Sequence, residues 1–312
     1  MINIVVCGLG GISKRVAQGI QFAENAHLYG ICSRSLEKAK AWQQEIPVEH
    51  IFTSYQDVYA DADVDCLYFC TPNNTHYSLV KDALCNGKSV MCEKPMVYSF
   101  KQLEELFKIA ESNHCFLMEA QKTMFSPLLE KVLEAIENGI IGKIKHVDAS
   151  YCFDMRAYAD PDQWHFQKGG GVAGDIGVYP ICGVYKIANS APASIQIFKK
   201  NYQEYPVDFV YEAYITFENG VTGSIHSNWI ENKIDKGSMF IFGEQGTIEI
   251  PAFWKGKIAY VHNARPETIE VSFDSDFTAE IEHAASCIEK GLCASPMLSF
   301  EKTKEILSAY QE

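Results

Sequence analysis

The sequence predicts an α/β protein of two domains. The first, over residues 1–120, is an α/β domain with a parallel sheet. The second, over residues 121–312, is an α+β domain built on a large, mostly antiparallel sheet. A chain of 312 residues is long enough for about two domains. Short apolar strands alternate with helical patterns as far as Ala120, which is typical of parallel strands joined by crossover helices. From Lys143 onward, long β-rich runs follow one another.

The first domain is expected to contain five strands and four helices. The strands are expected at Ile2–Cys7, His27–Ser33, Asp65–Cys70, Ser89–Cys92 and Cys115–Met118. The helices are expected at Lys14–Glu24, Leu36–Glu45, His76–Asn86 and Ser99–Ser112.

The second domain is expected to be a sheet with helices on one face. Strands are predicted at Lys143–Phe153, Ala193–Asn201, Phe209–Glu218, Val221–Glu231, Gly237–Phe242 and Thr247–Ile250. Helices are predicted at Ser126–Asn138, Phe277–Lys290 and Ser299–Tyr310. Asn219-Gly220 indicates a hairpin, because these residues accept the positive φ angles of a two-residue turn.

Composition excludes several classes of partner. The formal net charge is −13, so the chain repels nucleic acid and anionic membrane surfaces. No apolar run is long enough for a transmembrane helix, and the N-terminus enters a strand pattern without a signal peptide. The eleven cysteines form no Cys-x-x-Cys pair and the histidines lack ligand spacing. We therefore expect no metal site and a reduced, cytoplasmic protein.

A glycine-rich turn at Gly8–Ser13 lies between the first strand and the first helix. This context is typical of the dinucleotide fingerprint, in which glycines allow a tight turn and the helix N-terminus faces a pyrophosphate. Ser13 stands where Gly or Ala is usual, and it is small enough to pack there. The turn predicts a Rossmann dinucleotide-binding domain; a glycine turn without a ligand is the alternative. The predicted contacts here are Gly8, Gly10, Gly11 and Ile12.

The end of the second strand favours NADP over NAD, with NAD still possible. Ser33 stands where an acidic residue would bind the ribose 2′-hydroxyl of NAD. Arg34 follows at once, and Lys38 lies one helical turn further on. A hydroxyl beside a guanidinium suits a 2′-phosphate, although both cations could instead be solvated.

A third motif, Glu93-Lys94-Pro95, offers a group for chemistry beside the nucleotide. Proline restricts the backbone of the residue before it, which fixes where the Lys94 side chain begins. A lysine ammonium has a readily shifted pKa, so beside a nicotinamide it could polarise a carbonyl or pass a proton. An ordinary surface lysine before a turn is the alternative.

Taken together, these motifs resemble the Gfo/Idh/MocA family over nearly the whole chain. The further segments that carry the resemblance are Cys70-Thr71-Pro72-Asn73-Asn74-Thr75-His76, Met91-Cys92-Glu93-Lys94-Pro95, Glu119-Ala120 and Gly169-Gly170-Gly171-Val172-Ala173-Gly174-Asp175-Ile176-Gly177-Val178-Tyr179. The resemblance implies further cofactor contacts at Thr71, Pro72, Asn73, His76, Glu93 and Lys94.

The resemblance also implies the catalytic residues. Lys94 would be the catalytic lysine, and Asp175 could orient substrate and hold that lysine charged. Tyr179 lies four residues after Asp175, so on a helix the two share a face. The usual phenol pKa is ~10, and a nearby ammonium would lower it toward the range of a general acid/base. Tyrosine at this place resembles the branch with dimeric dihydrodiol dehydrogenase, xylose dehydrogenases and glucose-fructose oxidoreductase; a core aromatic is the alternative.

Two departures from the family pattern leave the substrate open. Lys122 and Met124 stand where many relatives carry Trp and Arg, and Trp164-His165 replaces Trp-Arg. The candidate substrate-binding residues are Lys122, Phe153, Arg156, Trp164, His165, Asp175 and Tyr179. Arg156 and His165 could equally be surface groups.

The sequence therefore predicts an NADP-preferring oxidoreductase that moves hydride to or from a hydroxyl/carbonyl carbon. Its small-molecule substrate would be a sugar, polyol or trans-dihydrodiol. A non-catalytic sensor of dinucleotide or sugar is the alternative, since fold does not fix function. We also expect a homodimer or tetramer formed through the sheet of the second domain, where Val210, Glu212, Tyr214 and Thr216 make a mixed face along one strand.

Overall fold

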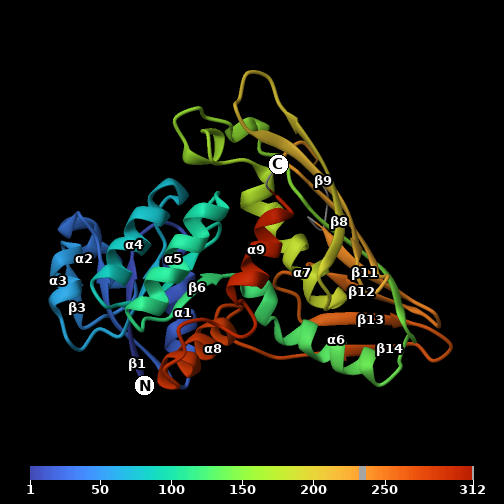
Figure 1. Cartoon of the computed structure of the whole chain (residues 1–312), viewed down its shortest axis with the longest axis horizontal. Coiled ribbons are helices and arrows are strands. Elements are labelled where there is room, and N and C mark those ends of the chain that lie inside the picture. The colour runs from blue at the N-terminus through green and yellow to red at the C-terminus, as the bar shows by residue number, and fades with distance from the viewer. Residues whose placement is uncertain (232–236, 311–312) are drawn as a thin grey trace. The chain divides into compact units, whose positions relative to one another are not determined.

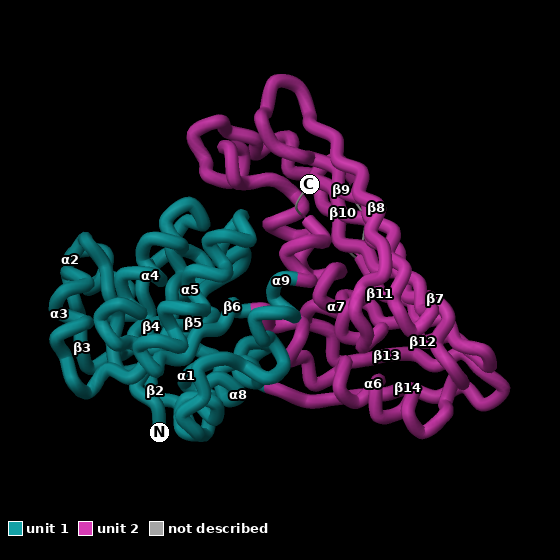
Figure 2. The backbone as a smooth tube through the Cα atoms, in the orientation of Figure 1, with its two compact units in different colours: residues 1–120, 274–304 teal, residues 121–273, 305–312 magenta. Residues whose placement is uncertain are grey.

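The computed structural model describes residues 1–231 and 237–310. The chain divides into two compact units (Figure 2). Unit 1 comprises Met1–Ala120 and Asp274–Lys304, and unit 2 comprises Gln121–Phe273 and Glu305–Glu312. The prediction had placed all of residues 121–312 in the second domain. Residues 274–304 differ from it, because they pack with the N-terminal residues.

Unit 1 contains a six-stranded sheet in the order β3-β2-β1-β4-β5-β6, with every neighbouring pair parallel. This order is that of dinucleotide-binding sheets. Its strands are β1 (Ile2–Cys7), β2 (Ala26–Cys32), β3 (His50–Phe52), β4 (Cys66–Phe69), β5 (Ser89–Glu93) and β6 (Leu117–Ala120). The sequence analysis missed β3, which is a half-buried edge strand of three residues and carries little pattern.

The helices of unit 1 begin and end near the predicted positions. They are α1 (Ser13–Phe22), α2 (Leu36–Glu45), α3 (Tyr55–Ala60), α4 (His76–Cys85), α5 (Phe100–Ser112) and α8 (Thr278–Glu289). The short helix α3 was not predicted. Serine side chains accept bonds from backbone N–H groups at the starts of α2 and α3, which satisfies donors that a helix end leaves open.

The segment that leads into α8 belongs to unit 1 because it packs on α1. A Cβ on Gly19 would come within 2.6 Å of the Cβ of Phe277, so the close approach requires glycine. The Arg15 guanidinium donates to both carboxylate oxygens of Asp276, at 2.7 and 2.8 Å. These contacts join residues more than 250 positions apart, and local sequence patterns do not reveal them.

Unit 2 is built on an eight-stranded sheet in the order β14-β13-β12-β11-β7-β10-β9-β8. Its strands are β7 (Ile144–Cys152), β8 (Pro192–Asn201), β9 (Asp208–Phe217), β10 (Thr222–Asn228), β11 (Ser238–Gly243), β12 (Thr247–Pro251), β13 (Ile258–His262) and β14 (Glu267–Glu270). β7 and β10 pair in parallel and the other neighbours are antiparallel, so the predicted mostly antiparallel sheet is confirmed. The two short, largely exposed strands β13 and β14 were not predicted.

Helices α6 (Pro127–Glu137) and α7 (Val178–Ala188) pack on one face of this sheet (Figure 1). The last helix, α9 (Phe300–Ser308), has residues in both units. Along β9 the side chains of Phe209, Tyr211, Ala213, Ile215 and Phe217 are buried. Glu212 and Tyr214 on the opposite face are exposed, as the alternation predicts. Within residues 1–231 and 237–310, no helix has the length and hydrophobicity to cross a bilayer.

Candidate active site

The glycine turn after β1 approaches the end of β4 too closely for a side chain. Gly8 has φ +92°, and a Cβ there would lie 2.7 Å from Thr71 Cγ2 and 3.0 Å from the carbonyl oxygen of Cys70. Gly10 is less constrained, with a Cβ 3.8 Å from the same carbonyl, and Gly11 faces open space. The turn is therefore a bare backbone surface before the N-terminus of α1, which is suited to an approaching phosphate.

Ser13 replaces the usual third small residue of the fingerprint without disturbing the turn. Its hydroxyl is fully buried, donates to the carbonyl of Gly10 at 2.7 Å and accepts from Trp42 Nε1 at 3.0 Å. Serine thus joins the turn to α2 through Trp42. The sequence analysis missed this role of Trp42, since nothing near it in the chain marks a contact with the turn.

The end of β2 presents its cations to solvent. The backbone N–H of Ser33 bonds to Phe52 on β3 at 3.0 Å, and the Ser33 hydroxyl accepts from the N–H of Ser35 at 3.3 Å. Arg34 and Lys38 are exposed, and neither forms an ion pair with a carboxylate among the residues described. Both side chains are therefore available to an anion at the start of α2.

The turn that carries Lys94 is held by three polar contacts. The Lys94–Pro95 peptide is cis. His76 Nδ1 lies 2.9 Å from the carbonyl oxygen of Pro95, and the Glu119 carboxylate accepts from the backbone N–H of Met96 at 2.6 Å. The Asn73 amide donates to the hydroxyl of Tyr98 at 3.2 Å. The backbone around Lys94 is thus fixed by buried side chains from three neighbouring elements.

His76 holds two turns together. Its ring is fully buried, and its Nε2 lies 2.8 Å from the carbonyl oxygen of Thr71 while Nδ1 faces Pro95. Burial lowers the pKa of His76, although both carbonyl contacts favour the charged form. Because both ring nitrogens face backbone oxygens, His76 is placed to position the two turns.

A buried group under the Lys94 turn was not anticipated. The Tyr68 hydroxyl lies 3.2 Å from Glu93 Oε1 and 3.0 Å from Glu280 Oε1. Burial and the two carboxylates raise the pKa of Tyr68, which keeps its hydroxyl protonated. Glu280 belongs to α8, more than 200 residues away in the chain, so no local signal connects it with this site.

In unit 2, the triple glycine lets an aspartate cap the next helical turn. Gly171 has φ +102°, and a Cβ there would collide with the Asp208 carboxylate. That carboxylate accepts from the N–H of Ala173 at 2.8 Å. Asp208 comes from β9, so the glycine allows β9 to hold the start of the segment that carries Asp175.

Asp175 and Tyr179 lie on a short π-helix, Ala173–Gly177, and on the start of α7. Among residues 171–188, all of which are described, these two alone are partly exposed and the other side chains are buried. Single π-turns are frequent at functional sites. The arrangement presents one carboxylate and one phenol from an otherwise covered helix.

The Tyr179 ring has an aromatic and a cationic neighbour. The ring centroid of Tyr151 lies 5.7 Å away, edge to face, and Tyr151 in turn stacks on Trp254 at 3.9 Å. Lys122 is buried, and its Nζ lies 5.5 Å from the centroid of the Tyr179 ring. The structure thus brings the predicted residues Lys122 and Tyr179 together and adds Tyr151 and Trp254, which the sequence analysis missed.

The other predicted substrate residues follow β7. The Phe153 ring lies 5.9 Å from that of Tyr151, and Trp164 stacks on His165 at 3.7 Å. Arg156 forms a bidentate pair with Asp154 and holds the pKa of that carboxyl at about 2. Lys94 belongs to unit 1, whereas Asp175 and Tyr179 belong to unit 2.

Comparison with known protein families identifies the family of this chain. Residues 2–121 match the oxidoreductase family with an NAD-binding Rossmann fold, and residues 129–249 match the GFO/IDH/MocA C-terminal domain. The chain belongs to the GFO/IDH/MocA family. It is therefore an NAD(P)-dependent oxidoreductase, as the resemblance implied.

Named relatives agree with this class, and a solved structure shares the fold. Trans-1,2-dihydrobenzene-1,2-diol dehydrogenase of Xenopus laevis is 29% identical and covers 98% of this chain and 95% of its own. The scyllo-inositol 2-dehydrogenase (NADP(+)) IolU of Bacillus subtilis is 30% identical, covering 58% of this chain and 56% of its own. The aldose-aldose oxidoreductase of Caulobacter crescentus has the same fold, with a TM-score of 0.87 at 21% identity over 98% and 94% of the two chains. These comparisons give no support to the sensor alternative.

Proposed function

We propose that the protein is an NADP-preferring dehydrogenase or reductase acting on the hydroxyl/carbonyl carbon of a sugar, polyol or trans-dihydrodiol. The observation that carries the proposal is the presentation of Asp175 and Tyr179 from a helix whose other residues are covered. A carboxylate and a phenol at this place form a proton-transfer pair, which a protein that only binds a ligand does not need.

The residues around the glycine turn fit a nicotinamide dinucleotide. A side chain at Gly8 would collide with Thr71 and with the carbonyl of Cys70, so only glycine keeps the turn this tight against the end of β4. A tight glycine turn before a helix N-terminus is the shape that a pyrophosphate requires. When bound, the nicotinamide supplies the hydride chemistry. The contacts proposed in the sequence analysis, from the glycine turn to Lys94, remain proposals for this group.

The protein residues would move the proton and hold the substrate. In the oxidative direction, Tyr179 takes the proton of the substrate hydroxyl as general base, and in reduction it returns it. Lys94 fixes the substrate oxygen and stabilises negative charge on it, and Asp175 orients the substrate. Lys122 beside the Tyr179 ring adds a second positive charge.

The substrate class follows from the chemistry beside Tyr179. Tyr151 and Trp254 form a stacked aromatic pair, and Lys122 and Asp175 supply polar groups. Flat apolar groups next to charged ones suit a ring that carries hydroxyls. Relatives named as dehydrogenases of dihydrobenzenediol and scyllo-inositol support the same class.

NADP preference rests on the end of β2. Ser33 carries no charge that would repel a 2′-phosphate, and the exposed Arg34 and Lys38 supply two positive charges. A relative that is named for NADP(+) supports this choice, although levoglucosan dehydrogenase, which has the same fold, is described with NADH.

Replacing Lys94 by alanine tests the assignment. Turnover should fall on the order of 10²–10³-fold, the usual cost of removing one group that stabilises charge developing on the reacting oxygen. NADPH absorbance would be followed against a panel of sugars, polyols and trans-dihydrodiols. NADPH binding, measured by fluorescence, should weaken far less than turnover, because the other predicted cofactor contacts remain. Lys101→Ala, on α5, is the matched control. If Lys94→Ala keeps most of the activity, the catalytic assignment is wrong; tight NADPH binding with no turnover by the unmodified protein would favour a sensor.

We further propose that the open face of the unit 2 sheet joins two copies of the chain. Phe198, Tyr214, Phe242 and Tyr260 lie on this face with 55, 46, 39 and 41% of their surface exposed. Aromatic side chains are enriched in subunit interfaces, and a two-fold pair is the commonest closed assembly. The proposal extends to a tetramer. A cytoplasmic location also remains a proposal, and the free thiols of the eleven cysteines fit it.

Light scattering at micromolar concentration should give at least twice the 35.0 kDa chain mass. Phe198→Glu should shift the mass toward one chain, because it replaces an exposed aromatic side chain of the proposed contact with a charge. Tyr158→Lys changes an exposed aromatic outside this sheet and should leave the mass unaltered. A monomer mass for the unmodified protein would contradict the proposal.

A further inference from the structure

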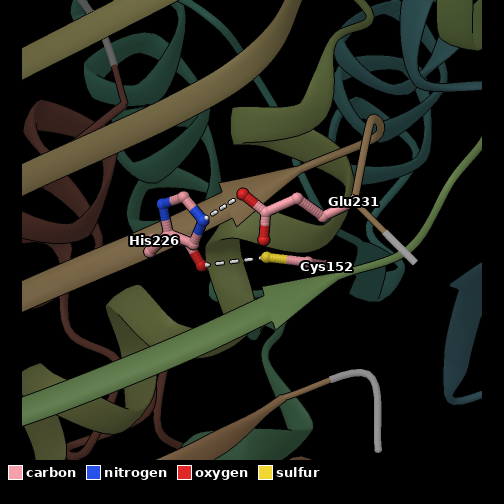
Figure 3. Close-up of side chains that lie close together, drawn as sticks. All are labelled: Cys152, His226 and Glu231. Atoms are coloured by element: carbon pink, nitrogen blue, oxygen red, sulfur yellow. Dashed lines mark hydrogen bonds and ion pairs between the residues drawn. The ribbon is translucent and has the colours of Figure 1, made fainter. Parts of the chain in front are cut away.

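Cys152, His226 and Glu231 converge at the end of the β7–β10 pair in unit 2 (Figure 3). Cys152 is the last residue of β7, and its strand partner on β10 is Asn228. The cysteine sulfur, a ring nitrogen of His226 and a carboxylate oxygen of Glu231 all lie within 4.8 Å of one another. None of these residues was singled out by the sequence, because the fold brings them together from positions up to 79 residues apart.

Two neighbours orient the donor atoms. Glu212 Oε1 lies 3.2 Å from His226 Nδ1 and can hold a proton on that nitrogen, which leaves the Nε2 lone pair for a ligand. The Asn228 side-chain amide lies 3.5 Å from the sulfur of Cys152, where it can donate to a thiolate. Carboxylate partners of histidine ligands are a regular feature of metal sites.

His226 Nε2 faces both a carboxylate oxygen and an amide NH₂ group. Nε2 lies 3.1 Å from Glu231 Oε1 and 3.0 Å from Asn228 Nδ2. The Asn228 oxygen accepts from the backbone N–H groups of Ile230 and Glu231, at 3.1 and 2.7 Å, so the NH₂ group must face the histidine. A protonated Nε2 would oppose that NH₂, and an unprotonated Nε2 would oppose the carboxylate oxygen.

From this geometry we infer that Cys152, His226 and Glu231 bind a divalent transition-metal ion, with Zn²⁺ as the best match. A cation among the three donors would receive the Nε2 lone pair, the thiolate and the carboxylate, so the carboxylate oxygen would no longer oppose that lone pair. Thiolate, imidazole and carboxylate are the ligand types of zinc. The prediction of no metal site rested on spacing along the chain, whereas this cluster depends on the pairing of β7 with β10.

The ion would link two segments that leave the sheet together. Beyond the strands, the N–H of Phe153 bonds to the carbonyl of Asn228 at 3.1 Å, and the N–H of Met155 bonds to the carbonyl of Trp229 at 2.9 Å. A metal on Cys152 and Glu231 would add a link between the side chains of these two segments. We therefore assign the ion a structural role, which does not depend on the proposed enzymatic activity.

Metal binding to the full chain tests the inference directly. Protein expressed with zinc, without a histidine tag and dialysed against a weak chelator, should contain about one zinc per chain by elemental analysis. After removal of the metal, titration with Co²⁺ should give the near-ultraviolet charge-transfer band of a cobalt–thiolate bond. Absence of bound metal, or Co²⁺ binding without the sulfur band, would overturn the assignment.

Variants separate this site from other cysteines and histidines. Glu212 would contact the ligand His226 and not the metal itself. Loss of such a partner weakens metal binding about 10–100-fold, so Glu212→Gln should bind zinc more weakly by this factor and keep the cobalt–thiolate band. Cys152→Ser should abolish the band and weaken zinc binding by more than about 100-fold, beyond that range. Glu231→Gln changes a partly exposed side chain, should fold normally, and should also weaken binding.

Cys287→Ser is the matched control. Cys287 also lies near a histidine, with its sulfur 3.5 Å from His283 Nε2 on α8. This variant should bind zinc and Co²⁺ as the unmodified protein does. If Cys287→Ser loses the band, or if Cys152→Ser and Glu231→Gln keep their affinity, the ion is bound elsewhere and the inference is wrong.

Discussion

The turns of unit 1 and the segment around Tyr179 in unit 2 are built in different ways. The turns at Gly8 and Lys94 are defined by backbone, through a glycine that admits no side chain and through buried His76 and Glu119, which hold main-chain atoms. The Tyr179 segment is defined by side chains, namely Lys122, Tyr151 and the phenol itself. The backbone of the turns is shaped to fit the cofactor, whereas the side chains around Tyr179 determine which substrate can bind.

This difference explains why the cofactor class is readable and the substrate is not. A glycine at positive φ and a proline after a lysine leave a mark in a short stretch of sequence. The aromatic pair Tyr151–Trp254 joins residues about a hundred positions apart and leaves none. The predictions below test whether the two regions separate in function as they do in construction.

The largest effect should come from Tyr179→Phe. Removing the phenolic hydroxyl keeps the ring beside Lys122 but deletes the group that exchanges the proton, so kcat should fall on the order of 10²–10⁴-fold. NADPH binding should not change, because Tyr179 belongs to unit 2 and the predicted cofactor contacts belong to unit 1. Steady-state kinetics and fluorescence titration measure the two quantities.

Tyr158→Phe provides the comparison for this variant. Tyr158 is 69% exposed and lies in the segment that follows β7. Its kcat should stay within a few-fold of the unmodified enzyme. Equal losses in the two variants would mean that Tyr179 acts only by packing.

Arg34→Ala should have the next largest effect and would sharpen the comparison. Losing a charged hydrogen bond costs ~1.5–3 kcal/mol, so the KM for NADP should rise on the order of ten- to hundredfold. The KM for NAD should change little, since NAD has no 2′-phosphate. Rates with both cofactors measure the difference. A rise in the KM for NADP alone would show that a side chain of unit 1 sets the choice between the two cofactors. An equal rise in both KM values would mean that Arg34 does not contact the 2′-phosphate.

Gly8→Ala should give the smallest effect and tests the backbone argument. The residue would be held at φ +92° with its Cβ against Thr71, so NADPH binding should weaken by about tenfold, which corresponds to 1.4 kcal/mol. Stability should also fall, by about 1–2 kcal/mol for a non-glycine residue in the left-handed region. Urea unfolding and NADPH titration measure the two losses.

Gly87→Ala separates the two losses. Gly87 also has positive φ, at +75°, but a Cβ there meets nothing within 4 Å. It should lose stability to a similar extent and keep its NADPH affinity. Unchanged NADPH affinity in Gly8→Ala would contradict the view that this turn admits no side chain.

The fold was largely predictable because its signals are local. The parallel strands of unit 1, the glycine turn and the alternation along β9 follow from patterns of fewer than ten residues. The division into units was predicted incorrectly for residues 274–304, since the contacts of Gly19 with Phe277 and of Arg15 with Asp276 are long-range. The strands β13 and β14 were missed because they are short and exposed, with little apolar pattern.

The candidate site was predictable to the same extent. Lys94, Asp175 and Tyr179 were proposed from motifs and remain predictions, whereas the roles of Trp42, Tyr68 and Glu280 depend on contacts that only the folded chain makes. The cluster of Cys152, His226 and Glu231 shows the same limit, because strand pairing and not spacing brings its donors together.

The return of residues 274–304 to unit 1 has a consequence for synthesis on the ribosome. The first 120 residues emerge early, yet the helix that covers Gly19 on α1 is translated only after all of β7–β14. Domains usually fold as units while the chain grows, so this nucleotide-binding unit must wait for its last helix with an apolar surface of α1 uncovered. We expect a fragment ending at residue 120 to aggregate, and the nascent protein to need a chaperone during that interval.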